Sequence, residues 1–175
     1  MTKQIRVLCD MDGVLCDFSA QYEKINGVYP DEVYVPGQPA TPEKEACWNR
    51  FVDQHGFEDI PILPGAPNLL AGVMRAFNGI QHSNFTIEIC TSAGGKARYN
   101  DVKPQKLLWL KNHGFGDFVT HITQNGYKKA DVIDLEKYHD ILIDDTPTVI
   151  ENFLSRGGFA ILHSDTDVDW TPRMC

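Results

Sequence analysis

Five short apolar segments spaced along the chain are the feature that most restricts its fold. Several are continuous apolar runs rather than alternations of apolar and polar residues, which is typical of strands covered on both faces. Segments with helical periodicity lie between them, and this alternation predicts a parallel α/β sheet with right-handed crossovers. The predicted strands are Ile5–Cys9, Phe85–Cys90, Phe118–Thr123, Asp140–Ile143 and Phe159–Leu162.

Three of the helical segments have recognisable ends. Pro67–Phe77 follows a Pro-Gly pair and stops before a glycine, and Pro104–His113 also stops before a glycine. In Thr146–Arg156, Thr146 is placed to cap the helix and Pro147 to occupy its first position. The chain has 175 residues, 42% of them hydrophobic, which is enough for one core of useful size.

A long insertion separates the first strand from the first of these helices. About fifty residues, from Asp17 to Pro64, stand where such a connection usually takes only a few. We expect helices over Phe18–Ile25 and over Pro42–His55, the second with Thr41 as its cap. Because the insertion leaves from the carboxyl end of a strand, where ligands bind in open α/β sheets, it is placed to act as a lid. Its many aromatic residues could instead form a small core of their own.

The net charge limits which kinds of molecule the protein is expected to bind. The chain carries 24 acidic and 16 basic residues, a formal net charge of −8. This surplus disfavours a nucleic-acid or anionic-membrane binder, because such proteins usually turn a basic surface toward the phosphates. A small anion can still bind where a metal ion or a local cationic pocket offsets the acidic groups.

The chain ends and the cysteines favour a cytoplasmic protein. The first residues match no signal peptide, and no apolar run reaches the length of a transmembrane helix. The cysteines are odd in number and lack zinc-binding spacings, so we interpret them as reduced thiols. Cys90 is read as a small apolar residue that ends a buried strand, rather than as a nucleophile. The five are Cys9, Cys16, Cys47, Cys90 and Cys175.

Paired carboxylates follow two of the predicted strands. Asp10 and Asp12 come directly after the first strand, and Asp144 and Asp145 after the fourth. If these strands are neighbours, the carboxylates converge, and like charges at close range require a proton or a cation. An oxygen-rich site of this kind suits Mg²⁺. Either pair alone could simply belong to a turn, since aspartate is common there.

The end of the second strand has the groups expected around a phosphate. Thr91 and Ser92 offer hydroxyls and amides, and a glycine-rich turn leads on to Lys96. Lys128 and Lys129 precede the fourth strand, and one lysine near the carboxylates would offset charge on a phosphate. Taken alone, the hydroxyls could cap a helix and each lysine could lie on a solvated face.

In this order, these motifs resemble the four motifs of the haloacid dehalogenase phosphatase superfamily. They are Asp10-Met11-Asp12-Gly13-Val14, Cys90-Thr91-Ser92, a lysine, and Leu142-Ile143-Asp144-Asp145. Further segments are similar to the 5′(3′)-deoxyribonucleotidases: Phe18, Leu63-Pro64-Gly65-Ala66, the Lys106/Trp109 helix and Gly157-Gly158-Phe159-Ala160-Ile161-Leu162-His163. The resemblance implies a Rossmann-like three-layer α/β/α sandwich with a five-stranded parallel sheet. Its core would be residues 1–17 and 65–175, with a small, mainly helical cap over 18–64.

The resemblance also implies roles for the motif residues. Asp10 would be the nucleophile that forms an aspartyl phosphate, and Asp12 the general acid and base. Thr91 and Ser92 would bind the transferring phosphate together with Lys129, for which Lys128 is the alternative. Mg²⁺ would be held by the Asp10 carboxylate, the Asp12 main-chain carbonyl and Asp144, with Asp145 close by.

Other residues are matched to the substrate side of the site. Lys96 resembles a second phosphate-side lysine of the family, one position further from Ser92 than the family pattern has it. Phe18, Trp48 and Phe57 fall where similar enzymes have aromatic residues near the nucleoside, and stacking on a base is a sound use of them. The segment from Gly27 to Ala40 departs from the family pattern, which leaves the identity of the substrate open.

The sequence therefore predicts a Mg²⁺-dependent phosphatase acting on nucleoside monophosphates through a phosphorylated Asp10. Alternatives within the same chemistry are another small phosphomonoester or the 3′-phosphate of a nucleic-acid end. A receiver-like phospho-acceptor switch would need an aspartate after the third strand, where Gln124 and Asn125 stand instead. A catalytically inactive nucleotide-binding relative is disfavoured because Asp10 and Asp12 are intact. Whether the chain works alone or as a homodimer is left open.

Overall fold

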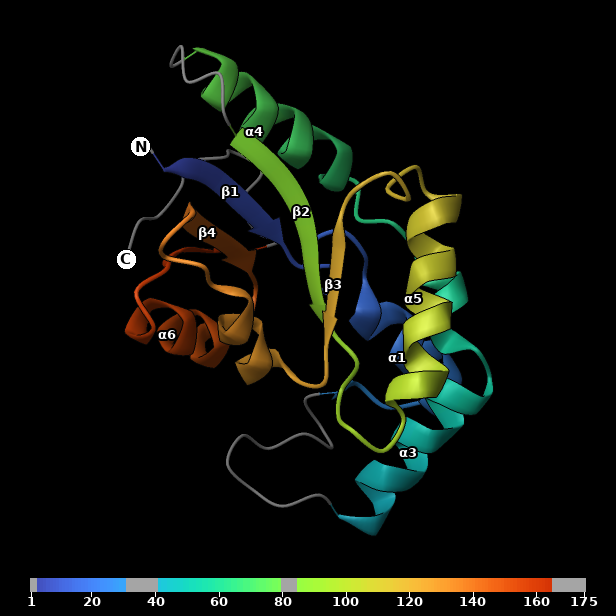
Figure 1. Cartoon of the computed structure of the whole chain (residues 1–175). Coiled ribbons are helices and arrows are strands. Elements are labelled where there is room, and N and C mark those ends of the chain that lie inside the picture. The colour runs from blue at the N-terminus through green and yellow to red at the C-terminus, as the bar shows by residue number, and fades with distance from the viewer. Residues whose placement is uncertain (1–2, 31–40, 80–84, 165–175) are drawn as a thin grey trace.

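A parallel five-stranded sheet forms the centre of the protein (Figure 1). The computed structural model describes residues 3–30, 41–79 and 85–164, so Cys175 and the cap segment 31–40 lie outside the described residues. The strand order is β3-β2-β1-β4-β5, and every neighbouring pair is parallel. The strands are β1 Gln4–Cys9, β2 Phe85–Ser92, β3 Thr120–Thr123, β4 Tyr138–Asp144 and β5 Phe159–Leu162. The predicted α/β fold is confirmed. β4 is three residues longer than predicted, β2 two residues longer and β1 one residue longer, whereas β3 is two residues shorter at its start.

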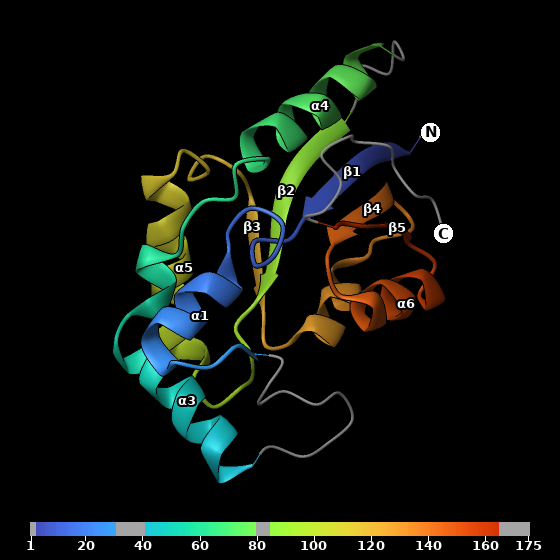
Figure 2. The ribbon, with the colours of Figure 1, turned by 180° about the vertical axis from the view of Figure 1, so that it is seen from behind.

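Helices cover both faces of this sheet. Helices α4 (Ala66–Gly79) and α5 (Tyr99–Asn112) pack on one face, and the 3₁₀ helix η2 (Gly126–Val132) and helix α6 (Pro147–Ser155) pack on the other (Figures 1 and 2). Because successive side chains of a strand point to opposite faces, Val7 and Leu8 of β1 belong to different buried clusters. In the described ranges, no helix is both long and apolar enough to cross a membrane.

Helix α5 starts five residues earlier than predicted, at Tyr99 rather than at Pro104. Pro104 therefore lies inside the helix, although its ring removes a backbone donor there. The extra turn is held by Arg98, whose guanidinium lies 2.6 Å from Asp101 Oδ2 and 2.6 Å from Asp53 Oδ1 of the insertion. The prediction was wrong because a contact with a distant segment, which no local pattern shows, stabilises this turn.

Thr146 occupies the predicted N-cap position of α6, but its side chain makes no capping hydrogen bond. The hydroxyl instead donates to Asp145 Oδ1 at 3.2 Å, and the backbone N–H donates to Asp144 Oδ1 at 2.9 Å. Pro147 follows in the first turn of the helix, where a missing N–H costs little. The start of α6 is therefore tied to the two carboxylates that end β4.

The insertion after β1 contributes the helices α1 (Phe18–Asn26) and α3 (Pro42–Asp53) and the 3₁₀ helix η1 (Gly56–Asp59). As predicted, Thr41 caps α3, accepting a hydrogen bond from the Lys44 N–H at 3.2 Å. The two ends of the insertion are joined at its base, where the Asp17 N–H donates to the Pro61 carbonyl at 2.8 Å. Figure 2 shows α1 and α3 beyond the carboxyl ends of the strands, beside α5.

The aromatic residues of the insertion do not form a separate core. Tyr22, Phe51 and Phe57 are buried in the same cluster as Trp109 of α5, and the Trp109 indole N–H donates to the Ile60 carbonyl at 2.7 Å. The insertion is thus fastened to the helix layer on one side of the sheet.

Candidate active site

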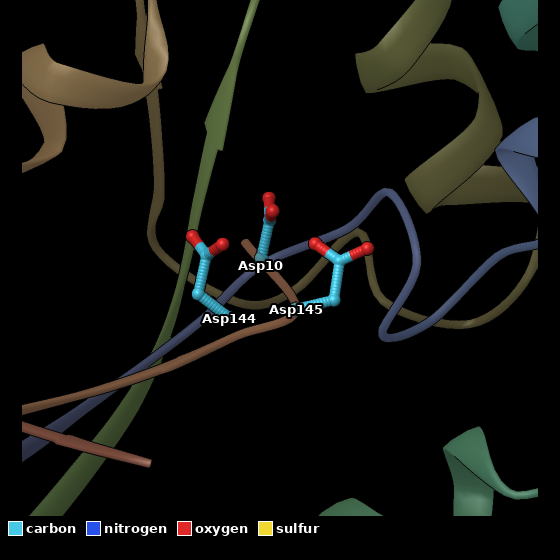
Figure 3. A group of neighbouring side chains, drawn as sticks. All are labelled: Asp10, Asp144 and Asp145. Atoms are coloured by element: carbon cyan, nitrogen blue, oxygen red, sulfur yellow. The ribbon is translucent and has the colours of Figure 1, made fainter. Parts of the chain in front are cut away.

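Three carboxylates meet at the carboxyl edge of the sheet. Asp10 follows β1 and Asp144 ends β4, and the pairing of Cys9 with Ile143 brings the two strand ends side by side. Asp145 completes the group, and one carboxylate oxygen from each of the three lies within 4.8 Å of the others (Figure 3). Asp10 and Asp144 are buried. The predicted convergence of the two strand ends is therefore what the structure has.

The turn after β1 depends on a glycine. Gly13 has a φ of +71°, and a Cβ at this position would collide with the Asp145 carboxylate. The Met11 N–H donates to Asp10 Oδ1 at 2.7 Å, which fixes the Asp10 carboxylate against its own turn. The turn can therefore approach the end of β4 only because residue 13 has no side chain.

Lys129 of η2 lies between two of these carboxylates. Its Nζ is 2.7 Å from Asp10 Oδ2 and 2.7 Å from Asp144 Oδ2, and the side chain is buried. Burial alone would lower the pKa of Lys129, but the charges of Asp10 and Asp144 raise it above its ordinary value. Lys128 is exposed and pairs with Asp131 at 3.0 Å. Of the two candidate lysines, the structure brings Lys129 to the carboxylates.

The three carboxylates of Asp10, Asp144 and Asp145 carry more negative charge together than Lys129 alone can offset. Desolvation, followed by the charge of Asp10, raises the pKa of Asp144 to about 6 and that of Asp145 to about 7. Such crowding favours a cation between the groups. Oxygen-only donors clustered within 4.8 Å fit Mg²⁺, which prefers carboxylate and water ligands.

Asp12 has a buried cationic partner of its own. Its carboxylate contacts the Nζ of Lys106, which also donates to Thr91 Oγ1 at 2.8 Å. Lys106 is fully buried, and it was not predicted as a site residue. The signal available in the sequence is a lysine at helical spacing between Val102 and Trp109, which are both buried on the inner face of α5.

A cavity of about 520 Å³ opens above the carboxylates. Asp10, Asp12 and Lys129 line one end, Ser92 lies beside them, and aromatic side chains form a wall. This volume is within the usual range for small-molecule sites. The predicted site residues that line it are Asp10, Asp12, Phe18, Trp48, Phe57, Ser92, Lys129 and Asp145.

Three other predicted site residues are not among those that line the cavity: Asp144, Thr91 and Lys96. Asp144 is fully buried and pairs with Lys129. Thr91 is fully buried behind Ser92 and meets Lys106 instead. Lys96 is exposed and is not among the residues around the cavity. The structure therefore does not bring Lys96 to the carboxylates.

The aromatic wall is packed from behind as well as open to the cavity. Phe18 and Phe57 stack with ring centroids 5.9 Å apart, and Trp48 meets Phe57 edge-on at 5.8 Å. Phe57 is almost completely buried, whereas Phe18 and Trp48 are half-buried. Of the three aromatic side chains in this wall, Phe18 and Trp48 therefore offer the most ring surface to a ligand.

Cys90 is not placed for nucleophilic chemistry. It is buried beneath the sheet edge, and burial raises the pKa of its thiol to about 12. The thiol therefore stays protonated at neutral pH, and a protonated thiol is a poor nucleophile. This agrees with its interpretation as a small apolar residue of the strand.

Comparison with solved structures shows the class of the fold. A haloacid dehalogenase-like hydrolase from Bacteroides fragilis has a TM-score of 0.61 at 16% identity, over 93% of this chain and 89% of that one. A haloacid dehalogenase-like protein from Streptococcus pneumoniae has a TM-score of 0.60 at 15% identity, over 93% and 85%. The HAD-hydrolase YfnB from Bacillus subtilis, bound to magnesium, has a TM-score of 0.56 at 14% identity, over 98% and 93%. The fold is that of the haloacid dehalogenase-like hydrolases.

Sequence relatives point to one branch of this class. The human cytosolic 5′(3′)-deoxyribonucleotidase is 29% identical over 163 residues, which cover 85% of this chain and 74% of that protein. The mouse mitochondrial 5′(3′)-deoxyribonucleotidase is 28% identical over 165 residues, covering 85% and 67%. No protein-family model matches the chain. The chain thus has the haloacid dehalogenase-like fold and resembles the 5′(3′)-deoxyribonucleotidases in sequence, which confirms the resemblance predicted from its motifs.

Proposed function

We propose that the protein is a Mg²⁺-dependent phosphomonoesterase that hydrolyses nucleoside monophosphates through an aspartyl phosphate on Asp10. The observation that carries this proposal is the position of Asp10, which faces the cavity with Lys129 and Asp144 beside it and Asp12 two residues further on. A nucleophile, an acid and a phosphate-side cation are thus available within one small site.

The residues divide the reaction into two displacements. An Asp10 oxygen bonds to phosphorus as the ester P–O bond breaks, and protonated Asp12 gives its proton to the leaving oxygen. A water oxygen then bonds to phosphorus as the bond to Asp10 breaks, and Asp12 takes back a proton from that water. The products are an alcohol and inorganic phosphate, and both aspartates return to their starting states. Lys129 pairs with Asp10 and adds positive charge beside the transferring phosphate.

The Mg²⁺ ligands in this proposal are the Asp10 carboxylate, the Asp12 main-chain carbonyl and the Asp144 carboxylate, with Asp145 nearby. The clustered oxygens of Asp10, Asp144 and Asp145 support it, as does the magnesium-bound YfnB of the same fold. When bound, the ion offsets charge on the phosphate oxygens and on the attacking carboxylate.

The nucleoside part of the proposal rests on the insertion, which we treat as a cap over residues 18–64 on a core of 1–17 and 65–175. Phe18 and Trp48 offer half-open aromatic faces to the cavity, and a nucleobase can stack on such faces. The relatives named 5′(3′)-deoxyribonucleotidase support the same class of substrate. Ser92 at the phosphate end is assigned to the transferring group.

A polymeric substrate suits the cavity less well. Its charged residues are Asp10, Asp12, Asp17, Asp145 and Lys129, so acidic groups dominate around the opening. A nucleic-acid end carries further phosphates, which need cationic partners outside the reacting position. A single phosphomonoester is therefore preferred to a phosphorylated oligonucleotide end.

We also place the protein in the cytoplasm. The four cysteines in the described part of the chain are free and buried, which suits a reducing compartment.

The proposal is tested by measuring phosphate release with Mg²⁺ from nucleoside monophosphates, sugar phosphates and a 3′-phosphorylated oligonucleotide. We expect the highest kcat/KM on a nucleoside monophosphate, and a drop in that preference over a sugar phosphate in Trp48→Ala. Glu45→Gln, a change at an exposed position of the same helix, is the control. Greater activity on the oligonucleotide or on a sugar phosphate would overturn the assigned substrate, and full activity in excess EDTA would overturn the metal dependence.

A further inference from the structure

Lys106 is a charged side chain with no exposed surface. It comes from the middle of α5, and its neighbours on that face are the buried Val102 and Trp109. An apolar residue would fit this position of the helix at lower cost, because burying an ammonium group requires compensating partners. The partners it has therefore indicate what it does.

All of the partners of Lys106 that the structure shows belong to the cavity or its immediate support. Its Nζ contacts the Asp12 carboxylate, donates to Thr91 Oγ1 at 2.8 Å, and lies 4.7 Å from the centre of the Phe57 ring. Thr91 directly precedes Ser92, which lines the cavity. One ammonium group thus joins the turn after β1, the end of β2 and the base of the insertion.

The contact with Asp12 leaves that carboxylate in a defined orientation. Lys106 holds Oδ2, the Cys16 thiol lies 3.7 Å from Oδ1, and the side chain keeps 27% of its surface exposed at the cavity. Asp12 stands on a turn, and the partners that the structure shows for its carboxylate are Lys106 and the Cys16 thiol. The ammonium group of Lys106 supplies that orientation from a rigid helix.

We propose that Lys106 is a positioning residue that holds Asp12 in place for proton transfer to the leaving oxygen. This inference rests on the proposed function, in which Asp12 is the acid. Lys106 does not reach the cavity, so it acts on the substrate only through Asp12 and Thr91. Lys129 has a different task, because it pairs with Asp10 and Asp144.

Comparing two substrates with different leaving groups distinguishes a role in proton transfer from a merely structural role. An alkyl oxygen, as in a nucleoside monophosphate, must be protonated as it leaves, whereas p-nitrophenolate leaves without a proton. The ratio kcat/KM reports the steps up to phosphoryl transfer to Asp10, where this proton is needed. For Lys106→Met we expect kcat/KM on the nucleotide to fall about 100-fold or more, and on p-nitrophenyl phosphate by less than about fivefold.

The matched control is Lys111→Met, which removes an exposed lysine from the same helix and is expected to leave both values unchanged. Equal losses of Lys106→Met on the two substrates would overturn the inference, because general damage to the site affects both. An unchanged kcat/KM on the nucleotide would also overturn it.

A double-mutant cycle covers the case in which Lys106→Met folds poorly. If Lys106 acts through Asp12, adding Lys106→Gln to Asp12→Asn should lower the residual activity on the nucleotide by less than about twofold, although Lys106→Gln alone lowers it strongly. Additive losses in the double variant would contradict a role through Asp12.

Failure of the proposed function is recognised separately, in the wild-type protein. If that protein hydrolyses some other alkyl phosphomonoester but no nucleotide, the substrate is wrong, and Lys106 is tested with that alkyl ester against p-nitrophenyl phosphate. If it hydrolyses no phosphomonoester, the proposed function fails, and the inference about Lys106 is overturned with it.

Discussion

The ammonium nitrogen of Lys129 lies 2.7 Å from Oδ2 of Asp10, although the two residues are far apart in the sequence. The contact is buried, and it sits on the residue that must attack phosphorus in the proposed reaction. The ammonium group offsets negative charge when this carboxylate and a phosphate approach one another. The same contact makes the folded state depend on Lys129.

Lys129→Met should therefore damage both stability and activity. It leaves Asp10 and Asp144 buried without their cation, a change of the kind that costs about 3–5 kcal/mol in the free energy of unfolding. Urea unfolding without metal checks this. Lys128→Met, one position earlier and exposed, should cost less than about 0.5 kcal/mol. Similar losses in the two variants would show that the buried pair contributes little.

Asp10→Asn should bring phosphate release below detection while the fold survives. The amide keeps the shape of the side chain but cannot form the acyl phosphate, and Lys129 keeps its contact with Asp144. Acid-quenched wild-type protein should carry a phosphoryl group on the peptide that contains Asp10, visible by mass spectrometry. Turnover by Asp10→Asn, or phosphorylation of that variant elsewhere, would rule out Asp10 as the nucleophile.

Mg²⁺ should stabilise the wild-type protein against heat. An ion that binds only the folded state at 100 times its Kd adds about 2.7 kcal/mol, and about 1 kcal/mol moves Tm by about 2–4 °C in a chain of this size. The Tm should therefore rise with added Mg²⁺ and return to its starting value with EDTA. A shift of the same size in Asp144→Asn would place the ion elsewhere.

Asp145→Asn should stabilise the metal-free protein in a pH-dependent way. The pKa of Asp145 is raised to about 7 in the folded protein, against an ordinary value of about 3.9. The folded state therefore holds the Asp145 proton more tightly than the unfolded state does. Above pH 7 the ionised carboxylate lowers the free energy of unfolding, and this loss of stability disappears as the pH falls toward 4.

Because Asp145 is exposed and screened, we expect at most about 1 kcal/mol at pH 8, which is about 2–4 °C in Tm. Thermal unfolding in EDTA at pH 8 and at pH 4 measures the difference between Asp145→Asn and wild type. If Asp145→Asn raises Tm by the same amount at pH 4 as at pH 8, titration of Asp145 is not the cause of the increase.

Gly94→Ala should disturb the aromatic wall. Gly94 has a φ of +72°, and a Cβ there would lie 2.5 Å from Trp48 Cζ2. We expect KM for a nucleotide to rise roughly tenfold, equivalent to about 1.4 kcal/mol of lost binding. Gly95→Ala is the control for backbone strain, because its φ is also unusual at +145° but a Cβ there meets no atom within 4 Å. Equal effects of the two changes would assign the loss to strain rather than to Trp48.

Local patterns predicted most of the fold. The five apolar runs are the strands of the sheet, and the glycines and prolines mark most helix ends, because these features act within a few residues. The start of α5 was missed because Arg98 is held by Asp53, which lies far away in the chain. Thr146 is at the predicted N-cap position, but its hydroxyl donates to Asp145 instead of accepting from an N–H of the first helical turn.

The candidate site was predictable where its residues end strands. Parallel strands bring their carboxyl ends to one edge, so the positions of Asp10 and Asp144 in the sequence are enough to predict that they lie together. Lys106 could not be placed in this way, because it projects from a helix and its partners are set by how that helix packs. Nor does sequence show that Thr91 faces inward while Ser92 faces the cavity, since that depends on the pleat of β2.

The hydrogen bond between Asp17 and Pro61 at the base of the insertion has a consequence for how proteins of this fold can acquire new insertions. Since the Asp17 and Pro61 ends of the insertion meet, a different segment could be exchanged there without altering the path of the core. The exchange is constrained, because Phe51 and Phe57 complete the apolar cluster around Trp109. A replacement segment would have to cover the same apolar surface of α5. A segment that brings a new substrate specificity must therefore also preserve the stability of the core.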